Sequence, residues 1–265
     1  MSNATTLPLR ASMTDQAQFW SDAAGRYEQD FIDPYRADVH NPLLPALTDL
    51  AGGGGRTAAD LGCGIGPLLP FLAAHFRQVL AVDFAEGMLS RARERCTALP
   101  NITFFRRALT DLRGLPRPVD VAVAVNSLVL PQLGELERCL ESIHALLRRG
   151  GTFLGIVPAM DSVHYLTMLL LDRARQTGMP ERAARKNAAV QAEHELYDFA
   201  FNEFRYRGLV QHFWQPFEVS YRLQRAGFHH VRLAKVELSW EQFGALKDLA
   251  GHPPPWDWFF QAEKP

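Results

Sequence analysis

The chain has 265 residues, of which 47% are hydrophobic and 22% charged, a composition typical of a globular domain with one large core and an inserted or appended cap. Its formal net charge of −1 excludes a global field that would draw it to nucleic acid or to an anionic membrane. The three cysteines, Cys63, Cys96 and Cys139, are widely spaced without a C-x-x-C motif, which predicts a reducing cytoplasmic location and no metal site.

The N-terminal segment divides into a polar part and a helical part. Residues 1–14 are predicted to be a flexible tail, and they lack the apolar run of a signal peptide. Residues 15–32 carry apolar groups at helical spacing, among them Phe19, Trp20 and Tyr27. We expect Phe19 and Trp20 to pack in the core. A second helix is predicted over residues 41–50.

A strand, a glycine turn and a helix follow in that order. The strand is predicted over residues 57–61 and the helix from Pro67 to His75. Between them, Gly62, Gly64 and Gly66 permit positive φ and close approach of a ligand. A dinucleotide fingerprint has two residues before its last glycine, whereas this turn has one. Asp60, two residues before the first glycine, disfavours a pyrophosphate and suits a cationic ligand with an amino-acid tail.

The stretch Asp-Leu-Gly-Cys-Gly-Ile-Gly at residues 60–66 resembles the first motif of class I S-adenosylmethionine (SAM)-dependent methyltransferases of the small-molecule type. The resemblance implies an α/β fold, with a Rossmann-like, doubly wound, mostly parallel seven-stranded sheet and an antiparallel last strand. It also implies SAM as cofactor and S-adenosyl-L-homocysteine as product. Tyr27 matches a helix that folds over the cofactor in that family, and Cys63 lies inside the cofactor turn.

The second strand, predicted over residues 78–83, is almost entirely apolar, as expected when helices cover both of its faces. It ends in Asp83, about 20 positions beyond the glycine turn, where a carboxylate accepts hydrogen bonds from ribose hydroxyls. Phe84 follows. Met88 resembles the family methionine that packs on adenine, and packing of its own helix, predicted to extend through Leu99, is an equal alternative.

Two later strands complete the predicted cofactor site. After the strand at residues 102–106, Ala108 stands where the family usually has an aspartate that receives the adenine amino group, which leaves the backbone of Leu109 as the adenine contact. After the strand at residues 119–125, Asn126 lies at the carboxyl end, where ligands bind in open α/β sheets. Many relatives have histidines a few residues later, but this chain has Pro131 and Gln132 there and offers no base.

The remaining core elements follow the same order. A helix is predicted over residues 136–147, ended by cations and glycines at residues 148–151, then a strand over residues 152–157. A helix over residues 218–226 and strands over residues 231–238 and 256–263 resemble the ending of the family. We therefore assign residues 15–157 and 216–265 to the SAM-binding core.

Residues 158–215 form a long insertion, predicted to be a helical and aromatic lid that binds the acceptor. Helices are expected at residues 162–176 and 180–195, and a hairpin at residues 204–214. Its aromatic side chains suit a flat acceptor, although most are expected to build the lid's own core. The candidate bases are His212 first, because aromatics surround it, and His164 second, ahead of His194 and Glu195.

These observations predict a SAM-dependent methyltransferase that acts on O, N or C of a small molecule, and an aromatic natural product or a quinone-type acceptor is the expected class. A non-catalytic SAM-binding protein is the alternative, favoured by Ala108 and the missing base, and an NAD(P)-dependent oxidoreductase is disfavoured by the glycine spacing. Neither a nucleic-acid acceptor nor membrane association is expected. The sequence leaves a homodimer open.

Overall fold

The computed structural model describes residues 13–52, 55–206 and 209–265. Four strands have the predicted bounds, and the fifth extends in both directions beyond its prediction: β1 Thr57–Leu61, β2 Gln78–Asp83, β3 Ile102–Arg106, β4 Val119–Val125 and β5 Leu147–Pro158. β1 is buried along its whole length and β2 along all but its first residue. Both strands therefore need a helical layer on each face of the sheet, which explains their continuous apolar sequence.

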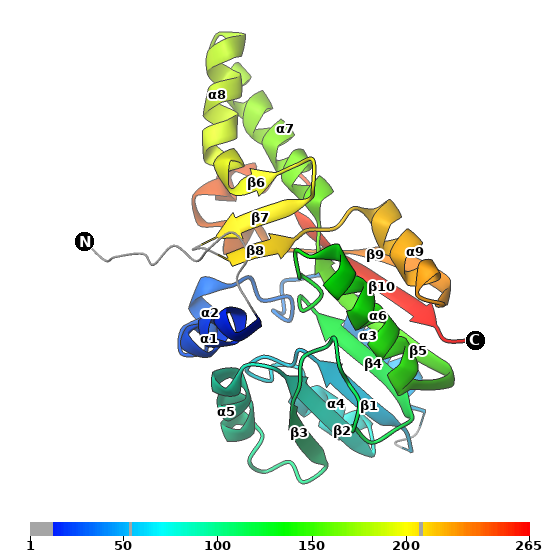
Figure 1. Ribbon diagram of the computed structural model, residues 1–265. Coiled ribbons are helices and arrows are strands. Elements are labelled where there is room, and N and C mark those ends of the chain that lie inside the picture. Colours follow the sequence, from blue (N-terminus) through cyan, green and yellow to red (C-terminus); the bar gives the residue numbers. More distant parts are fainter. Residues whose placement is uncertain (1–12, 53–54, 207–208) are drawn as a thin grey trace.

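The strands form a seven-stranded sheet in the order β3-β2-β1-β4-β5-β10-β9 (Figure 1). The first five pair in parallel, whereas β10 (Trp256–Glu263) is antiparallel to both β5 and β9 (His229–Glu237). This topology confirms the predicted mostly parallel sheet with an antiparallel last strand. The strand order reverses beside β1, where β2 lies on one side and β4 on the other, and ligands bind at such a point.

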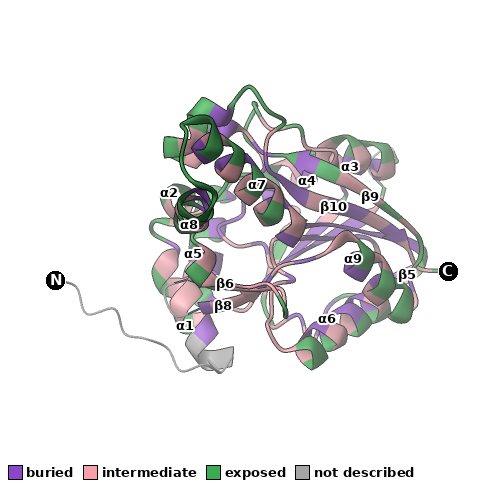
Figure 2. Cartoon of the chain, turned by 90° about the horizontal axis from the view of Figure 1, so that it is seen from above, coloured by how far each residue is buried: buried purple, intermediate pink, exposed green. Residues whose placement is uncertain are grey.

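Helices cover both faces of this sheet and enclose two cores (Figure 2). One face is covered by α3 Leu43–Ala51, α4 Leu69–His75 and α5 Glu86–Arg95. The other is covered by α6 Leu133–Leu146 and α9 Pro216–Arg225. Each helix packs its apolar stripe on a face of the sheet. Because these helices cover the faces, they leave the carboxyl ends of the strands open for a site.

Several predicted boundaries are wrong by two or more residues. Helix α4 begins at Leu69 rather than at Pro67. Arg148, predicted to end a helix, instead lies in β5, where its Nε donates to Asp120 Oδ1 at 2.6 Å. The helical pattern of residues 15–32 forms two helices, α1 (Met13–Ala23) and α2 (Tyr27–Asp30). The first twelve residues of the predicted tail lie outside the described residues, and its last two belong to α1.

The insertion leaves the sheet and returns to it at one point, since the Trp214 N–H donates to Pro158 O at 2.8 Å and the Met160 N–H to Trp214 O at 3.0 Å. Its elements are α7 Met160–Gln176, α8 Glu181–Gln191, the 3₁₀ turn η1 His194–Leu196, and the three-stranded sheet β6 Tyr197–Asp198, β7 Glu203–Tyr206 and β8 Leu209–His212.

A 3₁₀ segment from the C-terminal part of the core, η2 (Trp240–Leu249), packs on α7 and α8 through Trp240 and Leu249. We propose that residues 158–215 and η2 together form one cap, which stands above the carboxyl ends of the parallel strands (Figure 1). No helix in the described ranges is long and apolar enough to cross a bilayer.

Candidate functional site

The glycine turn after β1 has the backbone that the sequence predicted. Gly62, Gly64 and Gly66 have φ of 78°, 54° and 78°. A β-carbon on Gly62 would lie 2.3 Å from Ser127 Cβ, and one on Gly66 would lie 3.1 Å from Ala92 Cβ, whereas one on Gly64 would meet nothing within 4 Å. Gly62 and Gly66 therefore permit tight packing of the turn against Ser127 and α5, whereas Gly64 faces open space.

Asp83 fixes this turn from the end of β2. Its Oδ2 accepts the Gly64 N–H at 2.9 Å and its Oδ1 accepts the Ala85 N–H at 2.9 Å. Burial raises the pKa of the Asp83 carboxyl, and the backbone N–H groups of Ala85, Gly64 and Phe84 oppose that shift. The carboxylate keeps acceptor capacity for a further donor, so Asp83 can hold the turn and a ligand hydroxyl together.

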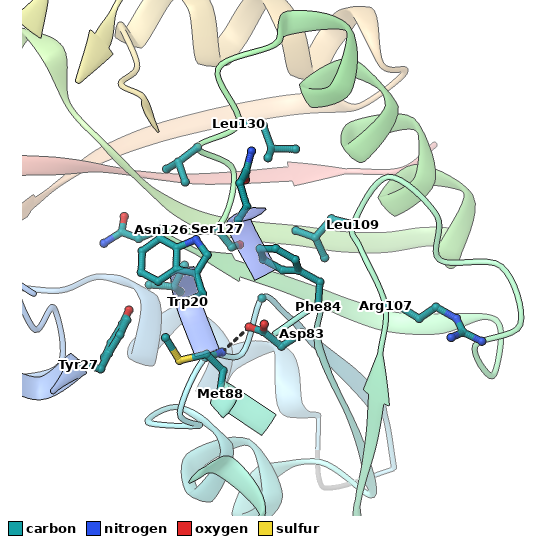
Figure 3. A pocket seen from close by; sticks show the side chains of 15 residues that line it. Trp20, Tyr27, Asp83, Phe84, Met88, Arg107, Leu109, Asn126, Ser127 and Leu130 are labelled. Carbon is teal, nitrogen blue, oxygen red and sulfur yellow. Dashed lines mark hydrogen bonds between the residues drawn. The ribbon is translucent and has the colours of Figure 1, made fainter. Parts of the chain in front are cut away.

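A cavity begins at this turn and continues between α1 and the strand ends (Figure 3). Phe84, Met88 and Leu109 give it apolar walls. Eight of the predicted cofactor residues line it, namely Tyr27, Gly62, Gly64, Asp83, Phe84, Met88, Leu109 and Asn126. Ala108 does not, because it borders a separate surface depression beside α1. Gly66 lies behind the turn and acts through packing.

Trp20, assigned to core packing by the sequence, lines this cavity together with Gln16 and Arg107. Trp20 lies on α1, whose position depends on Gly87 of α5: a β-carbon there would lie 2.5 Å from Ser21 O. The helical spacing of α1 did not reveal this position, because packing in a core and lining a cavity require the same apolar stripe.

A second cavity lies on the other side of the turn, next to Asp60. The Asp60 side chain is buried, and its Oδ2 has no hydrogen-bond partner among the described residues. Burial first, and the charge of Asp83 second, raise the pKa of Asp60 to about 7. A buried carboxylate with an unused oxygen is a site for a cation. Cys63 also lines this cavity, but burial raises the pKa of its thiol and makes it a poor nucleophile.

A third cavity of about 400 Å³ lies between the sheet and the cap. Its volume is within the range of small-molecule sites. Tyr197, Phe204 and Phe213 of the cap line it and also pack on one another, with ring centroids 4.8 Å and 5.2 Å apart along that series. These rings therefore serve both the cap's own core and the cavity. Tyr27 and Asn126 border all three cavities, so the three cavities meet at these two residues, between the glycine turn and the cap.

Neither histidine predicted as a base faces this cavity. His212 is buried, and its Nε2 lies 3.1 Å from Glu218 Oε2 on α9. Side chains alternate along β8, so its neighbours Gln211 and Phe213 line the cavity while His212 points to the opposite side. His164 is exposed on α7 and stacks on Phe199 at 4.8 Å. The aromatic residues around these histidines in the sequence therefore did not bring either side chain to the lining of this cavity.

Asp257 was not a candidate in the sequence, yet it lines the third cavity. It lies near the start of β10, opposite Pro158 at the end of β5. The Asn126 side chain and the Ala159 N–H both donate hydrogen bonds to its carboxylate, while burial raises its pKa to about 7. Only the antiparallel pairing of β10 brings this residue to the carboxyl ends of the parallel strands.

Comparison with known proteins agrees with this geometry. Residues 58–151 match a family model described as a methyltransferase domain. Among curated proteins, the chain is 29% identical over 149 residues to human mitochondrial arginine-hydroxylase NDUFAF5, covering 55% of this chain and 41% of that protein. It is 30% identical over 152 residues to malonyl-[acyl-carrier protein] O-methyltransferase of Serratia marcescens, covering 57% and 55%. The alignments thus span about two fifths to just over half of these relatives.

Solved structures share the fold over most of their length. The N-methyltransferase NodS of Bradyrhizobium japonicum, in complex with S-adenosyl-L-homocysteine, aligns with a TM-score of 0.56 and 14% identity over 93% of this chain and 98% of its own. A SAM-dependent methyltransferase from Mesorhizobium loti aligns with a TM-score of 0.56 and 23% identity over 84% and 96%. At these identities the likeness establishes the fold alone.

Proposed function

This chain carries a class I SAM-dependent methyltransferase domain, and from that premise we propose that the protein transfers the methyl group of SAM to a small-molecule acceptor. The observation that carries the proposal is the meeting of three cavities at Tyr27 and Asn126. One has the features of a nucleoside site, one those of a site for an amino-acid tail, and one those of an acceptor site. A bound SAM supplies an activated methyl group on a sulfonium.

The residues present fit that cofactor. The unpartnered Asp60 Oδ2 suits the ammonium of the methionine tail, and the open space before Gly64 leaves room for the ligand backbone. Asp83 has lone pairs for the ribose hydroxyls, and Phe84 and Leu109 provide walls for an adenine ring. Residues of this kind bind and orient, and orientation alone contributes roughly 7–11 kcal/mol to such displacements in favourable cases.

The cap supports a small and largely apolar acceptor. Its rings line the third cavity and shield a bound acceptor from water on that side, which strengthens electrostatic interactions there. A cavity of about 400 Å³ does not accommodate a folded protein or a duplex, so we propose a free small molecule with a planar, aromatic or quinone-type body.

Calorimetry with SAM, S-adenosyl-L-homocysteine and NAD tests the cofactor assignment. We expect heat from the first two and none from NAD, and the reverse result would refute the proposal. Turnover of labelled SAM against a panel of phenols, hydroxyquinones, amines and carbon acceptors then tests catalysis. Binding of SAM without transfer to any panel member would favour a non-catalytic SAM-binding protein instead.

A further inference from the structure

The third cavity contains one carboxylate whose surroundings prepare it to receive a proton. Asp257 is 9% exposed and accepts hydrogen bonds from the Asn126 side chain and the Ala159 N–H. Both donors favour the ionised form, whereas burial favours the protonated form. A carboxyl group under these opposing influences can exchange a proton near neutral pH, which is the requirement for a general base.

Asn126 connects this carboxylate to the junction of the cavities. It follows β4 with a φ of 50°, a conformation that asparagine tolerates better than most residues. With its amide nitrogen donating to Asp257, its Oδ1 is buried and has no partner among the described residues. Because Asn126 borders all three cavities, Asp257 lies one hydrogen bond away from the region where a methyl donor and an acceptor would meet.

The other titratable groups in the cavity lining are unsuited to this role. Burial raises the pKa of Tyr27 to about 12 and raises that of Tyr197 further, so both phenols keep their protons. Asp30 forms an ion pair with Arg26, with Asp30 Oδ2 and Arg26 Nη2 3.5 Å apart. Asp257 forms no ion pair with a described residue, so its negative charge is not offset by a cation.

The charged groups on the neighbouring elements are engaged elsewhere. Asp161 on α7 accepts the Trp258 Nε1–H at 2.8 Å. The Lys235 ammonium on β9 lies 3.3 Å from the centroid of the Trp256 ring, and Glu237 on the same strand pairs with His40 at 3.7 Å.

We propose that Asp257 is the catalytic base of the methyl transfer and that its substrate is a planar acceptor with a phenol-like hydroxyl. This inference rests on the proposed function. The aromatic rings of the lining hold the flat body of the acceptor, and the hydroxyl points at the Asp257 carboxylate. The resulting class of reaction is O-methylation.

The step balances without a further reactant. The acceptor O–H proton passes to an Asp257 oxygen, and a lone pair of the acceptor oxygen forms the new C–O bond. The S–CH₃ bond breaks, and its electron pair neutralises the sulfonium. Asp257 then releases its proton to solvent when the product leaves. Asn126 acts as a positioning residue that orients the carboxylate.

The variants that test this are Asp257→Asn, which keeps the shape, and Asp257→Glu, which keeps the charge. Asp161→Asn is the matched control, because its carboxylate lies on a neighbouring element and outside the cavity lining. Thermal melting establishes that each variant is folded. The first readout needs no turnover: 4-nitrophenol, whose ionisation changes its absorbance, is titrated into each protein with and without S-adenosyl-L-homocysteine.

We expect the wild type and Asp161→Asn to bind 4-nitrophenol equally and Asp257→Asn to bind it at least fivefold more weakly. In single turnover with labelled SAM and a phenol that the wild type methylates, Asp257→Asn should lose about 100-fold or more in rate. Its SAM affinity should stay within twofold of the wild type. The wild-type rate should rise with pH through about 7, and that rise should be absent in Asp257→Asn and present in Asp257→Glu.

Two results overturn the inference while the proposed function stands. One is a wild type that methylates phenols at the same rate and with the same pH profile as Asp257→Asn. The other is a wild type that binds SAM but neither binds nor methylates any phenol, which removes the acceptor class. A wild type that does not bind SAM instead refutes the proposed function itself.

Discussion

The affinity of the protein for SAM should increase with pH between about 5.5 and 7.5, because Asp60 must be ionised to hold the ligand's ammonium. The pKa of Asp60 is raised to about 7 by burial and by the charge of Asp83. A nearby cation favours the carboxylate, so binding below that pH has to expel a proton. The sign is therefore fixed: protons compete with the ligand.

The size of the effect follows from the ionised fraction. With a pKa of about 7, about 3% of Asp60 is ionised at pH 5.5 and about 75% at pH 7.5. The dissociation constant should fall about 25-fold over that range, equivalent to nearly 2 kcal/mol. Among the groups around Asp60, the Tyr35 phenol and Cys63 thiol have raised pKa values and stay protonated, and Arg95 in the same lining is paired with Glu28.

Calorimetry at about pH 6 in two buffers of different ionisation enthalpy measures the protons released, and we expect close to one per SAM bound. Asp60→Asn is the control, since its side chain is neutral at every pH. It should bind SAM with a nearly constant affinity, similar to that of the wild type at low pH. A wild-type affinity that is flat or falls with pH over this range would show that Asp60 does not hold the cation.

Four further substitutions test the glycine turn, the core and the cap separately. Gly62→Ala should lower the free energy of unfolding by about 3 kcal/mol, because the new β-carbon collides with Ser127. Gly64→Ala should lower the free energy of unfolding by only about 1 kcal/mol, from its positive φ, and should reduce the free energy of SAM binding by more than that. Equal losses of unfolding free energy in urea for Gly62→Ala and Gly64→Ala would contradict this prediction. His212→Ala should lower the free energy of unfolding by about 2 kcal/mol, because it leaves the buried Glu218 carboxylate with one partner fewer. The pH profile of methyl transfer should not change. If the rise of the rate with pH disappeared in this variant, His212 would again be the candidate base. Phe213→Ala should raise KM for the acceptor and leave SAM affinity unchanged, and a weaker SAM affinity would place this ring at the wrong site.

The cofactor side of the site could be predicted from the sequence because it is local. Asp60, the glycines and Asp83 lie at the ends of two adjacent strands, and the apolar strand sequence fixes where each strand ends. Parallel pairing then brings those ends together with little freedom. The positive φ values of the turn follow from the same short stretch, since glycine adopts them most readily.

The residues of the proposed acceptor cavity were decided by tertiary structure. His212 and Phe213 are adjacent in sequence, yet strand alternation places only the ring of Phe213 in the cavity lining. Asp257 lies 131 positions after Asn126, and only the antiparallel register that pairs it with Pro158 brings its carboxylate to the carboxyl ends of the parallel strands. Sheet pairing at long range and the direction of each side chain leave no mark on local periodicity, so Asp257, the proposed base, could be found only in the folded protein.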